Sequence, residues 1–121
     1  MANKKLTEEL IDRLVTTGLQ RNTAIALVFI AENEETQSRT IEDNTRLRQP
    51  EVSIATNQLV RRGWVKKRDI KTEGKGRPVI GYSMKKPIGE IVKEIEADER
   101  KKMDAIDSNI KRIKEIKDKM F

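Results

Sequence analysis

The last 35 residues of the chain carry the pattern that most restricts its fold. From Pro87 to Phe121 nothing breaks a helical pattern, so we expect one helix about 50 Å long. Apolar side chains recur along it at steps of three and four residues, with Glu99 and Lys117 as the two polar exceptions, which is typical of a coiled coil. The apolar members of this stripe are Val92, Ile95, Met103, Ile106, Ile110, Ile113 and Met120.

A helix with such a stripe cannot bury it against itself, so it needs a partner. In a chain of 121 residues a second copy is the natural partner. We therefore expect residues 87–121 to form a dimerisation helix that joins two copies in a homodimer. The alternative is that Ile88, Ile91 and Ile95 pack on the preceding domain while the rest of the helix stays solvated.

The composition limits the chemistry that the chain can perform. It contains 0 cysteines and 0 histidines. Thiolate nucleophiles, disulfides, imidazole catalysis and the usual zinc and haem ligand sets are therefore excluded. An enzyme would depend on carboxylates or lysine, and the acids lie on predicted helix faces where a solvated surface is the ordinary explanation. We predict that the protein is not an enzyme and holds no cofactor or metal.

No segment of the sequence is typical of a membrane span or an export signal. The longest apolar run, Ala24–Ala31, has eight residues, whereas a membrane helix needs 18 or more. The basic residues 1–5 are followed by Leu6 and then by acidic residues, without the apolar stretch of a signal peptide. We expect a cytoplasmic protein with no membrane partner.

Two helices are predicted at the start of the chain. Thr7 is expected to cap the first helix, and Gly18 to stop it. Asn22 is expected to cap the second, which is apolar nearly all round over residues 24–30. This second helix is predicted to lie at the centre of the fold, and the polar run over residues 32–38 to end it.

The next two helices are predicted to form a helix-turn-helix. Thr40 followed by Asp43 matches a capping pattern for a short third helix that ends before Arg46. Pro50 suits the first turn of a fourth helix, expected over Pro50–Arg62, and Gly63 is placed to end it in a left-handed conformation. A tight turn between two short helices is typical of a helix-turn-helix.

A β-hairpin is predicted directly after these helices. Residues 64–70 and 79–84 are rich in strand-forming side chains, and the loop between them, residues 71–78, carries two glycines and a proline. A helix-turn-helix followed by such a hairpin is the layout of a winged helix. The predicted fold is therefore mainly α with a small β-hairpin wing (α+β), with a winged helix-turn-helix domain over residues 1–86.

The positive charge of the chain is concentrated in one segment. The net charge is +6, and residues 49–86 hold ten basic and three acidic side chains, whereas the segments on either side are close to neutral. Such segregation is expected of a surface that faces a polyanion. The alternative is a basic surface that serves solubility alone.

The fourth helix is predicted to have a packed face and a reading face. Val52, Ala55, Thr56 and Leu59 cluster on one side at 100° per residue. The outward group is Pro50, Ile54, Asn57 and Arg61, flanked by Ser53 and Gln58. Amide and guanidinium groups read adenine and guanine edges in the major groove. Ile54 is predicted either to contact a thymine methyl group or to contact another part of the protein.

Basic residues after the reading face are predicted to bind phosphates and the minor groove. Cations neutralise phosphates without reading sequence, and arginine enters narrow minor grooves. For Lys75 and Arg77 at the tip of the loop, an ordinary solvated turn is the alternative. The predicted phosphate and wing contacts are Arg62, Lys66, Lys67, Arg68, Lys71, Lys75 and Arg77.

Residues 48–55, with Gly63-Trp64-Val65, Gly74-Lys75-Gly76-Arg77-Pro78 and Tyr82, resemble the recognition helix and wing of MarR-type and TrmB-type winged-helix transcription regulators, especially small archaeal ones. The resemblance implies that Gln49, Pro50, Ser53, Ile54 and Asn57 lie on the helix that reads DNA, and that Arg77 lies at the wing tip. It also implies a dimer that binds near-palindromic operators and, in many members, represses transcription.

These patterns together predict a homodimeric repressor that reads double-stranded DNA with residues 50–62 and contacts the backbone or minor groove with residues 71–78. A two-fold dimer prefers half-sites about one helical turn, roughly 10 base pairs, or a multiple of it apart. The alternative is a winged-helix adaptor in the transcription machinery with weak, non-specific DNA binding. The operator, and any small-molecule effector, stay unidentified by the sequence.

Overall fold

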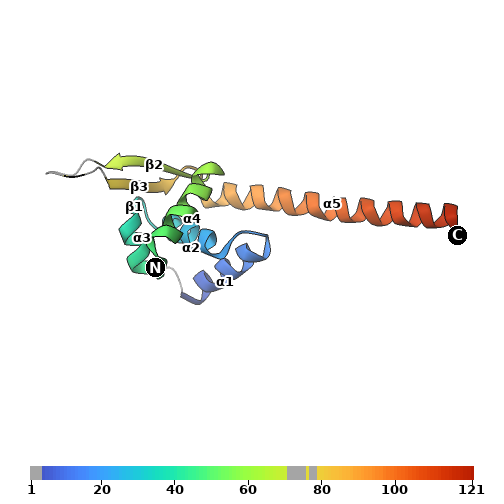
Figure 1. The fold of residues 1–121 in the computed structure, drawn as a ribbon, viewed down its shortest axis with the longest axis horizontal. Helices are drawn as coiled ribbons and strands as arrows, with labels where there is room; N and C mark the ends of the chain where they lie inside the picture. The colour runs from blue at the N-terminus through green and yellow to red at the C-terminus, as the bar shows by residue number, and fades with distance from the viewer. Residues whose placement is uncertain (1–3, 71–75, 77–78) are drawn as a thin grey trace. The chain divides into compact units, whose positions relative to one another are not determined.

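The computed structural model describes residues 4–70, 76 and 79–121. Two units make up the chain, Met1–Ile88 and Gly89–Phe121. Among the described residues the first unit holds four helices and three strands, and the second unit is a single long helix (Figure 1). The elements in chain order are α1 (Lys4–Thr16), α2 (Arg21–Ala31), β1 (Thr36–Gln37), α3 (Ser38–Thr45), α4 (Gln49–Arg61), β2 (Val65–Ile70), β3 (Val79–Met84) and α5 (Ile88–Met120).

Helix α2 is the centre of the first unit, as its sequence predicts. It packs against α1, α3, α4 and β3. Ala24, Ala26, Leu27 and Ile30 of this helix have no exposed surface. Because neighbouring elements surround α2, each of its apolar faces packs against another element.

The sheet has three antiparallel strands in the order β1-β3-β2. The predicted hairpin is confirmed: β2 pairs with β3 from Val65 opposite Met84 to Ile70 opposite Val79. Strand β1 was not predicted, because the polar run in which it lies was expected only to end the preceding helix. It places Thr36 opposite Tyr82 on the other side of β3. β2 is therefore an edge strand of this sheet.

The predicted starts of the first three helices are wrong. α1 begins at Lys4, so Thr7 lies within the helix, and its hydroxyl donates to Glu32 at 3.3 Å. α2 is preceded by Gln20 in an extended conformation, and Asn22 lies in the first turn. α3 is preceded by Gln37 rather than by Thr40, and neither glutamine makes a side-chain cap hydrogen bond. Thr7 and Asn22 bond to other elements instead of capping their own helix.

The helix-turn-helix is confirmed, with α4 starting one residue earlier than predicted. Arg46, between α3 and α4, adopts a left-handed conformation with φ of 65°, which reverses the chain. Pro50 lies in the first turn of α4. At the other end Gly63 has φ of 77°, as predicted for a helix stop. The N–H of Trp64 then donates to the carbonyl of Leu59 at 3.1 Å, which directs the chain into β2.

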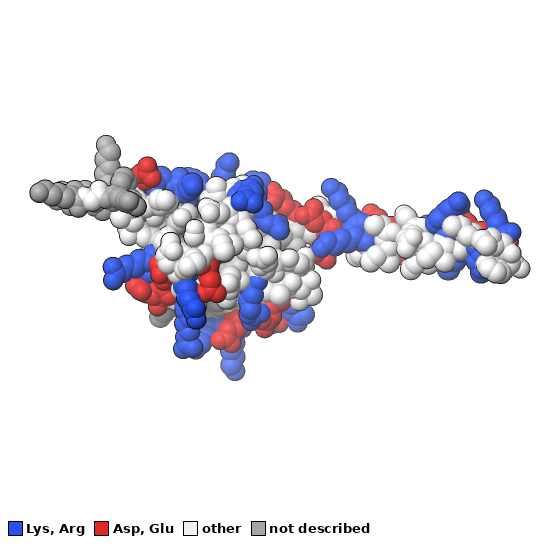
Figure 2. All heavy atoms as spheres, in the orientation of Figure 1, with Lys and Arg blue, Asp and Glu red and all other residues white. Residues whose placement is uncertain are grey.

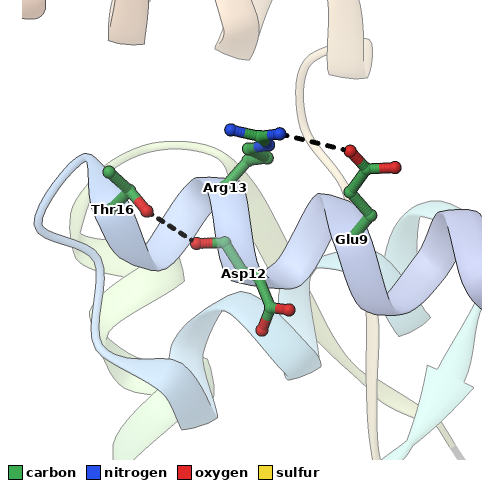
Figure 3. A network of polar contacts seen from close by, with 4 residues as sticks. All are labelled: Glu9, Asp12, Arg13 and Thr16. Atoms are coloured by element: carbon green, nitrogen blue, oxygen red, sulfur yellow. Dashed lines mark hydrogen bonds and ion pairs between the residues drawn. The ribbon is translucent and has the colours of Figure 1, made fainter.

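Polar contacts between neighbouring residues line the exposed side of α1 (Figure 3). Arg13 donates to the Glu9 carboxylate at 3.4 Å, and the Thr16 hydroxyl donates to the backbone carbonyl of Asp12 at 3.0 Å. Asp12 also accepts from Arg21 at 2.7 Å, which joins α1 to the first residue of α2. Exposed ion pairs of this kind contribute less than about 1 kcal/mol each.

Helix α5 forms the second unit and carries its apolar side chains on an exposed stripe. Of its residues only Ile91 is buried. Met103, Ile106 and Ile113 are each about three-fifths exposed. Its ion pairs include Arg100–Glu96 and Arg112–Glu115, which join neighbours on the same helix. Within the described residues, no helix combines the length and the apolarity that a membrane span requires.

Candidate nucleic-acid interface

The inward face of α4 is buried where the sequence predicts it. Val52, Ala55, Thr56 and Leu59 are each at most 1% exposed. The hydroxyl of Thr56 donates to the carbonyl of Val52 at 2.8 Å, so the polar group in this apolar face has a partner. The helix is therefore fixed on its scaffold by one full face, and its opposite face is free of packing.

That opposite face presents all six predicted base-reading residues. Five of them are exposed and Ser53 is half-buried. Ile54 is 58% exposed in the middle of the face, although its side chain is apolar. The residues on this face, which we call the reading face, are Gln49, Pro50, Ser53, Ile54, Asn57 and Arg61.

A polar seam that the sequence did not predict sets the position of α4 on α2. Near the start of α4, Asn22 donates to the carboxylate of Glu51 at 3.2 Å. Toward its end, the Thr23 hydroxyl donates to the amide oxygen of Gln58. The amide nitrogen of Gln58 donates in turn to Gln20 at 3.2 Å. Gln58 was expected to flank the reading face. This is wrong, because its amide oxygen accepts from Thr23 of α2 and its amide nitrogen donates to Gln20, the residue before α2.

Glu51 also stabilises the first turn of α4. One carboxylate oxygen accepts the backbone N–H of Arg48 at 2.9 Å, and the other accepts the hydrogen bond from Asn22. A carboxylate three residues after the N-cap satisfies a backbone donor that the helix leaves unpaired, and it interacts favourably with the helix dipole. One side chain therefore fixes both the start of the helix and its contact with α2.

Basic side chains follow the reading face into β2. Arg61, Arg62, Lys66 and Lys67 are all exposed. The guanidinium of Arg62 lies 4.8 Å from the ring centre of the buried Trp64, close enough for a cation–π contact. This contact orients Arg62 while its charge stays in solvent. The three remaining predicted cations, Lys71, Lys75 and Arg77, lie outside the described residues.

Among the described cations after the reading face, Arg68 has a carboxylate acceptor inside the protein. Its guanidinium donates to both oxygens of Glu35, at 2.7 and 2.9 Å. This hydrogen bond and the charge of Arg68 lower the pKa of Glu35 below its ordinary value of 4.5, and they raise the pKa of Arg68. The sequence predicted a phosphate contact here and contained no signal for the pairing, since the two residues are 33 positions apart.

Gly81 provides the space for this ion pair. In the sheet it lies between Arg68 of β2 and Gln37 of β1. A Cβ atom at this position would lie 2.7 Å from the Ile70 side chain and 3.0 Å from the Glu35 carboxyl carbon. A glycine in the central strand thus lets the Glu35 side chain cross close to the backbone and reach Arg68.

Both signs of charge occur on the surface, and the described residues offer no metal site. Figure 2 shows blue atoms along the strands and red and blue atoms interspersed over the helices of the first unit. Among residues 4–70, 76 and 79–121, no group of three or more acidic side chains is arranged to hold a metal ion.

Comparison with known proteins assigns this region to a family. A sequence profile of the MarR family matches residues 17–76, from the loop before α2 into the wing. Residues 17–76 form a MarR family domain. The MarR-type resemblance is therefore confirmed, while the TrmB-type likeness and an archaeal origin stay predictions. No protein of curated function matches the sequence closely enough to be counted as a relative.

A solved structure shows the same fold as this chain. It is the crystal structure of a MarR family transcription regulator, which superposes with a TM-score of 0.53 at 17% sequence identity. The match covers 88% of this chain and 68% of the other. At this identity the likeness shows the fold alone, and the predicted winged helix is confirmed by it and by the element order of the first unit.

Proposed function

We propose that this MarR family protein is a sequence-specific transcription regulator that binds double-stranded DNA as a homodimer and represses transcription. The observation that carries the proposal is the reading face: α4 is packed along one side and exposes amide, hydroxyl and guanidinium groups along the other. These are the groups that distinguish base pairs in the major groove. The family match and the structural match support a DNA-binding regulator.

In this proposal the reading face enters the major groove and recognises bases. Asn57 supplies an amide for adenine and Arg61 a guanidinium for guanine. Ile54 contacts a thymine methyl group, since an isoleucine 58% exposed among polar residues otherwise leaves apolar surface in water. Gln49, Pro50 and Ser53 lie toward the first turn of the same helix and complete the contact.

The exposed cations beside the reading face bind phosphates. Arg62, Lys66 and Lys67 are placed after α4 and along the edge strand β2, and they would hold the helix in register on the duplex without reading sequence. Lys71, Lys75 and Arg77 are proposed to extend this contact through the wing. Arg68 contributes through its pair with Glu35, which ties β2 to the segment before β1.

Residues 1–86 are proposed to act as the DNA-binding domain and residues 87–121 as the dimerisation helix. The apolar stripe of α5 supports the second assignment, because eight exposed large apolar side chains on one helix favour association. The proposal gives the protein no catalytic activity and no cofactor. A cytoplasmic location follows from its proposed work on DNA.

Selection of bound sequences from a random pool of duplex DNA at moderate salt tests the proposal. We expect the wild-type protein to enrich one half-site, repeated with two-fold symmetry. The matched control is Arg13→Gln, which removes one positive charge from α1 and should enrich the same sequence. Binding without any enriched sequence would contradict the proposal and would favour the alternative, a winged-helix adaptor that docks on other proteins of the transcription machinery.

A further inference from the structure

We propose that the apolar stripe of α5 is covered by α5 of a second copy running antiparallel, with the partner's Lys117 opposite Glu99. The inference rests on the homodimer of the proposed function and adds its orientation and register. It starts from the exposure of the stripe. Side chains 40–68% exposed recur along the helix, at Met103, Ile106, Ile110, Ile113, Ile116 and Met120.

The charge of α5 changes sign along its length. Residues 88–99 hold five acidic side chains and one basic side chain, a net charge of −4. Residues 100–121 hold eight basic and four acidic side chains, a net charge of +4. Figure 2 shows red atoms toward the beginning of this helix, blue atoms directly after them, and blue atoms again toward its end beyond a white stretch.

This distribution favours an antiparallel partner. A parallel dimer would place the acidic segment beside the partner's acidic segment, whereas an antiparallel dimer that pairs Glu99 with the partner's Lys117 places the end of the acidic segment beside the partner's Lys117 and the partner's Lys119. The helix dipole also favours acids at a helix start and bases at its end, but that effect falls off within one turn. The opposite charges here extend over many turns, so the dipole alone does not account for them.

The two polar residues within the stripe set the register. In a parallel dimer each stripe residue meets its own copy, so Glu99 would face the partner's Glu99 and Lys117 the partner's Lys117. An antiparallel register that places Ile106 opposite the partner's Ile110 also places Met103 opposite the partner's Ile113. The same register brings Glu99 to the partner's Lys117. The apolar stripe residues between the two charges, Met103, Ile106, Ile110 and Ile113, are then each matched by an apolar side chain of the partner, and the two charges within the stripe are paired.

Orientation determines how far apart the two copies present their first units. In this register the starts of the two α5 helices are offset by 40 residue positions, or about 60 Å along the shared axis at 1.5 Å per residue. In a parallel dimer they would lie side by side. The antiparallel arrangement therefore favours operators whose half-sites are separated by more than one helical turn.

Disulfide crosslinking of the full chain tests both orientation and register. Because the natural sequence has 0 cysteines, each introduced thiol is unique. We compare Glu99→Cys, Lys117→Cys and the double variant under mild oxidation. The proposal expects a covalent dimer from the double variant and none from either single variant. Dimers from the single variants would show a parallel pair and overturn it, and absence of a crosslink in all three would overturn the register.

Charge reversal gives an independent measurement that needs no covalent bond. Glu99→Lys is expected to weaken the dimer roughly tenfold or more in sedimentation experiments, because it sets two lysines against each other twice per dimer. Adding Lys117→Glu to the same chain should restore the wild-type affinity. A parallel dimer would respond equally to the single and the double variant, and a wild-type protein that sediments as a monomer would end the proposal. Both experiments are made without DNA, so a failure of DNA recognition would be seen separately.

Discussion

Helices α4 and α5 of this chain place their apolar residues in opposite ways. α4 buries Leu59 and Val52 against its own unit and exposes mainly polar groups. α5 buries only Ile91 and exposes a stripe of isoleucine and methionine along the rest of its length. An exposed polar face next to basic side chains suits a charged, hydrated partner, whereas an exposed apolar stripe suits a partner that is itself apolar. The two surfaces thus favour different partners.

The polar contacts of the two units differ in the same way. The first unit has neighbour pairs such as Arg13–Glu9, but it also has contacts that join elements far apart in the sequence, as with Arg68 and Glu35 or Gln58 and Thr23. In α5 the pairs Arg100–Glu96 and Lys102–Glu99 join neighbours on one helix. Long-range contacts fix how elements lie on one another, and neighbour pairs support only the helix itself. We infer that the first unit defines its own shape and that α5 depends on a partner.

The largest effect, on the free energy of unfolding, is expected from shortening a side chain on the buried face of α4. Leu59 has no exposed surface, so Leu59→Ala should lower the free energy of unfolding by about 2–5 kcal/mol through lost burial and the cavity that remains. The fluorescence of Trp64, the only tryptophan, reports the transition because its ring is buried in the same unit.

Ile54→Ala is the matched control on the reading face of the same helix. Ile54 is 58% exposed, so the change should alter the free energy of unfolding by less than about 0.5 kcal/mol. Equal losses for Leu59→Ala and Ile54→Ala would contradict the division of α4 into a packed and a free face.

A smaller effect, on DNA binding alone, should separate the reading face from the cations of β2. Asn57→Ala is expected to lose about 1–3 kcal/mol of discrimination at one base pair. Lys67→Ala is expected to weaken binding to all sequences alike and to reduce the slope of affinity against salt by about one unit. Titrations of labelled duplexes at several salt concentrations measure both. If the two variants change specificity and salt slope identically, the two groups do not have separate roles.

The bounds of α4 could be predicted from the sequence because its signals are local. Pro50 and Gly63 fix the two ends through their own backbone preferences, and each predicted end is wrong by one residue. The inward face follows from the spacing of Val52, Ala55 and Leu59, which needs no knowledge of the rest of the fold. The reading face is what remains on the other side of the same helix.

The unpredicted features all depend on partners distant in the sequence. Strand β1 has two residues, too few to show a period, and exists because Thr36 pairs with Tyr82. Asn22 carries the side chain of a helix cap, yet bonds to Glu51 of another helix. The sequence also gives no signal for the acceptor of Arg68, because Arg68 is one of four consecutive charged residues.

The smallest effect is expected at the ion pair between Arg68 and Glu35. The pKa of Glu35 is lowered in the folded protein, chiefly by the hydrogen bond from Arg68. A lowered folded pKa means that the stabilisation is present above the ordinary value of 4.5 and is lost as the pH falls through the folded pKa. Arg68→Gln should therefore raise the titration midpoint of the Glu35 carboxyl toward 4.5. The carbon chemical shift of that carboxyl group, recorded as a function of pH, measures the midpoint.

Lys67→Gln is the control for this titration, because it removes a positive charge from the same strand without touching the pair. It should leave the midpoint of Glu35 nearly unchanged, since a hydrogen-bonded guanidinium stabilises the carboxylate more strongly than a solvated lysine nearby. Equal shifts in the two variants would mean that general positive charge along β2, rather than the contact with Arg68, sets the pKa of Glu35. In that case this long-range contact would no longer distinguish the first unit from the neighbour pairs of α5.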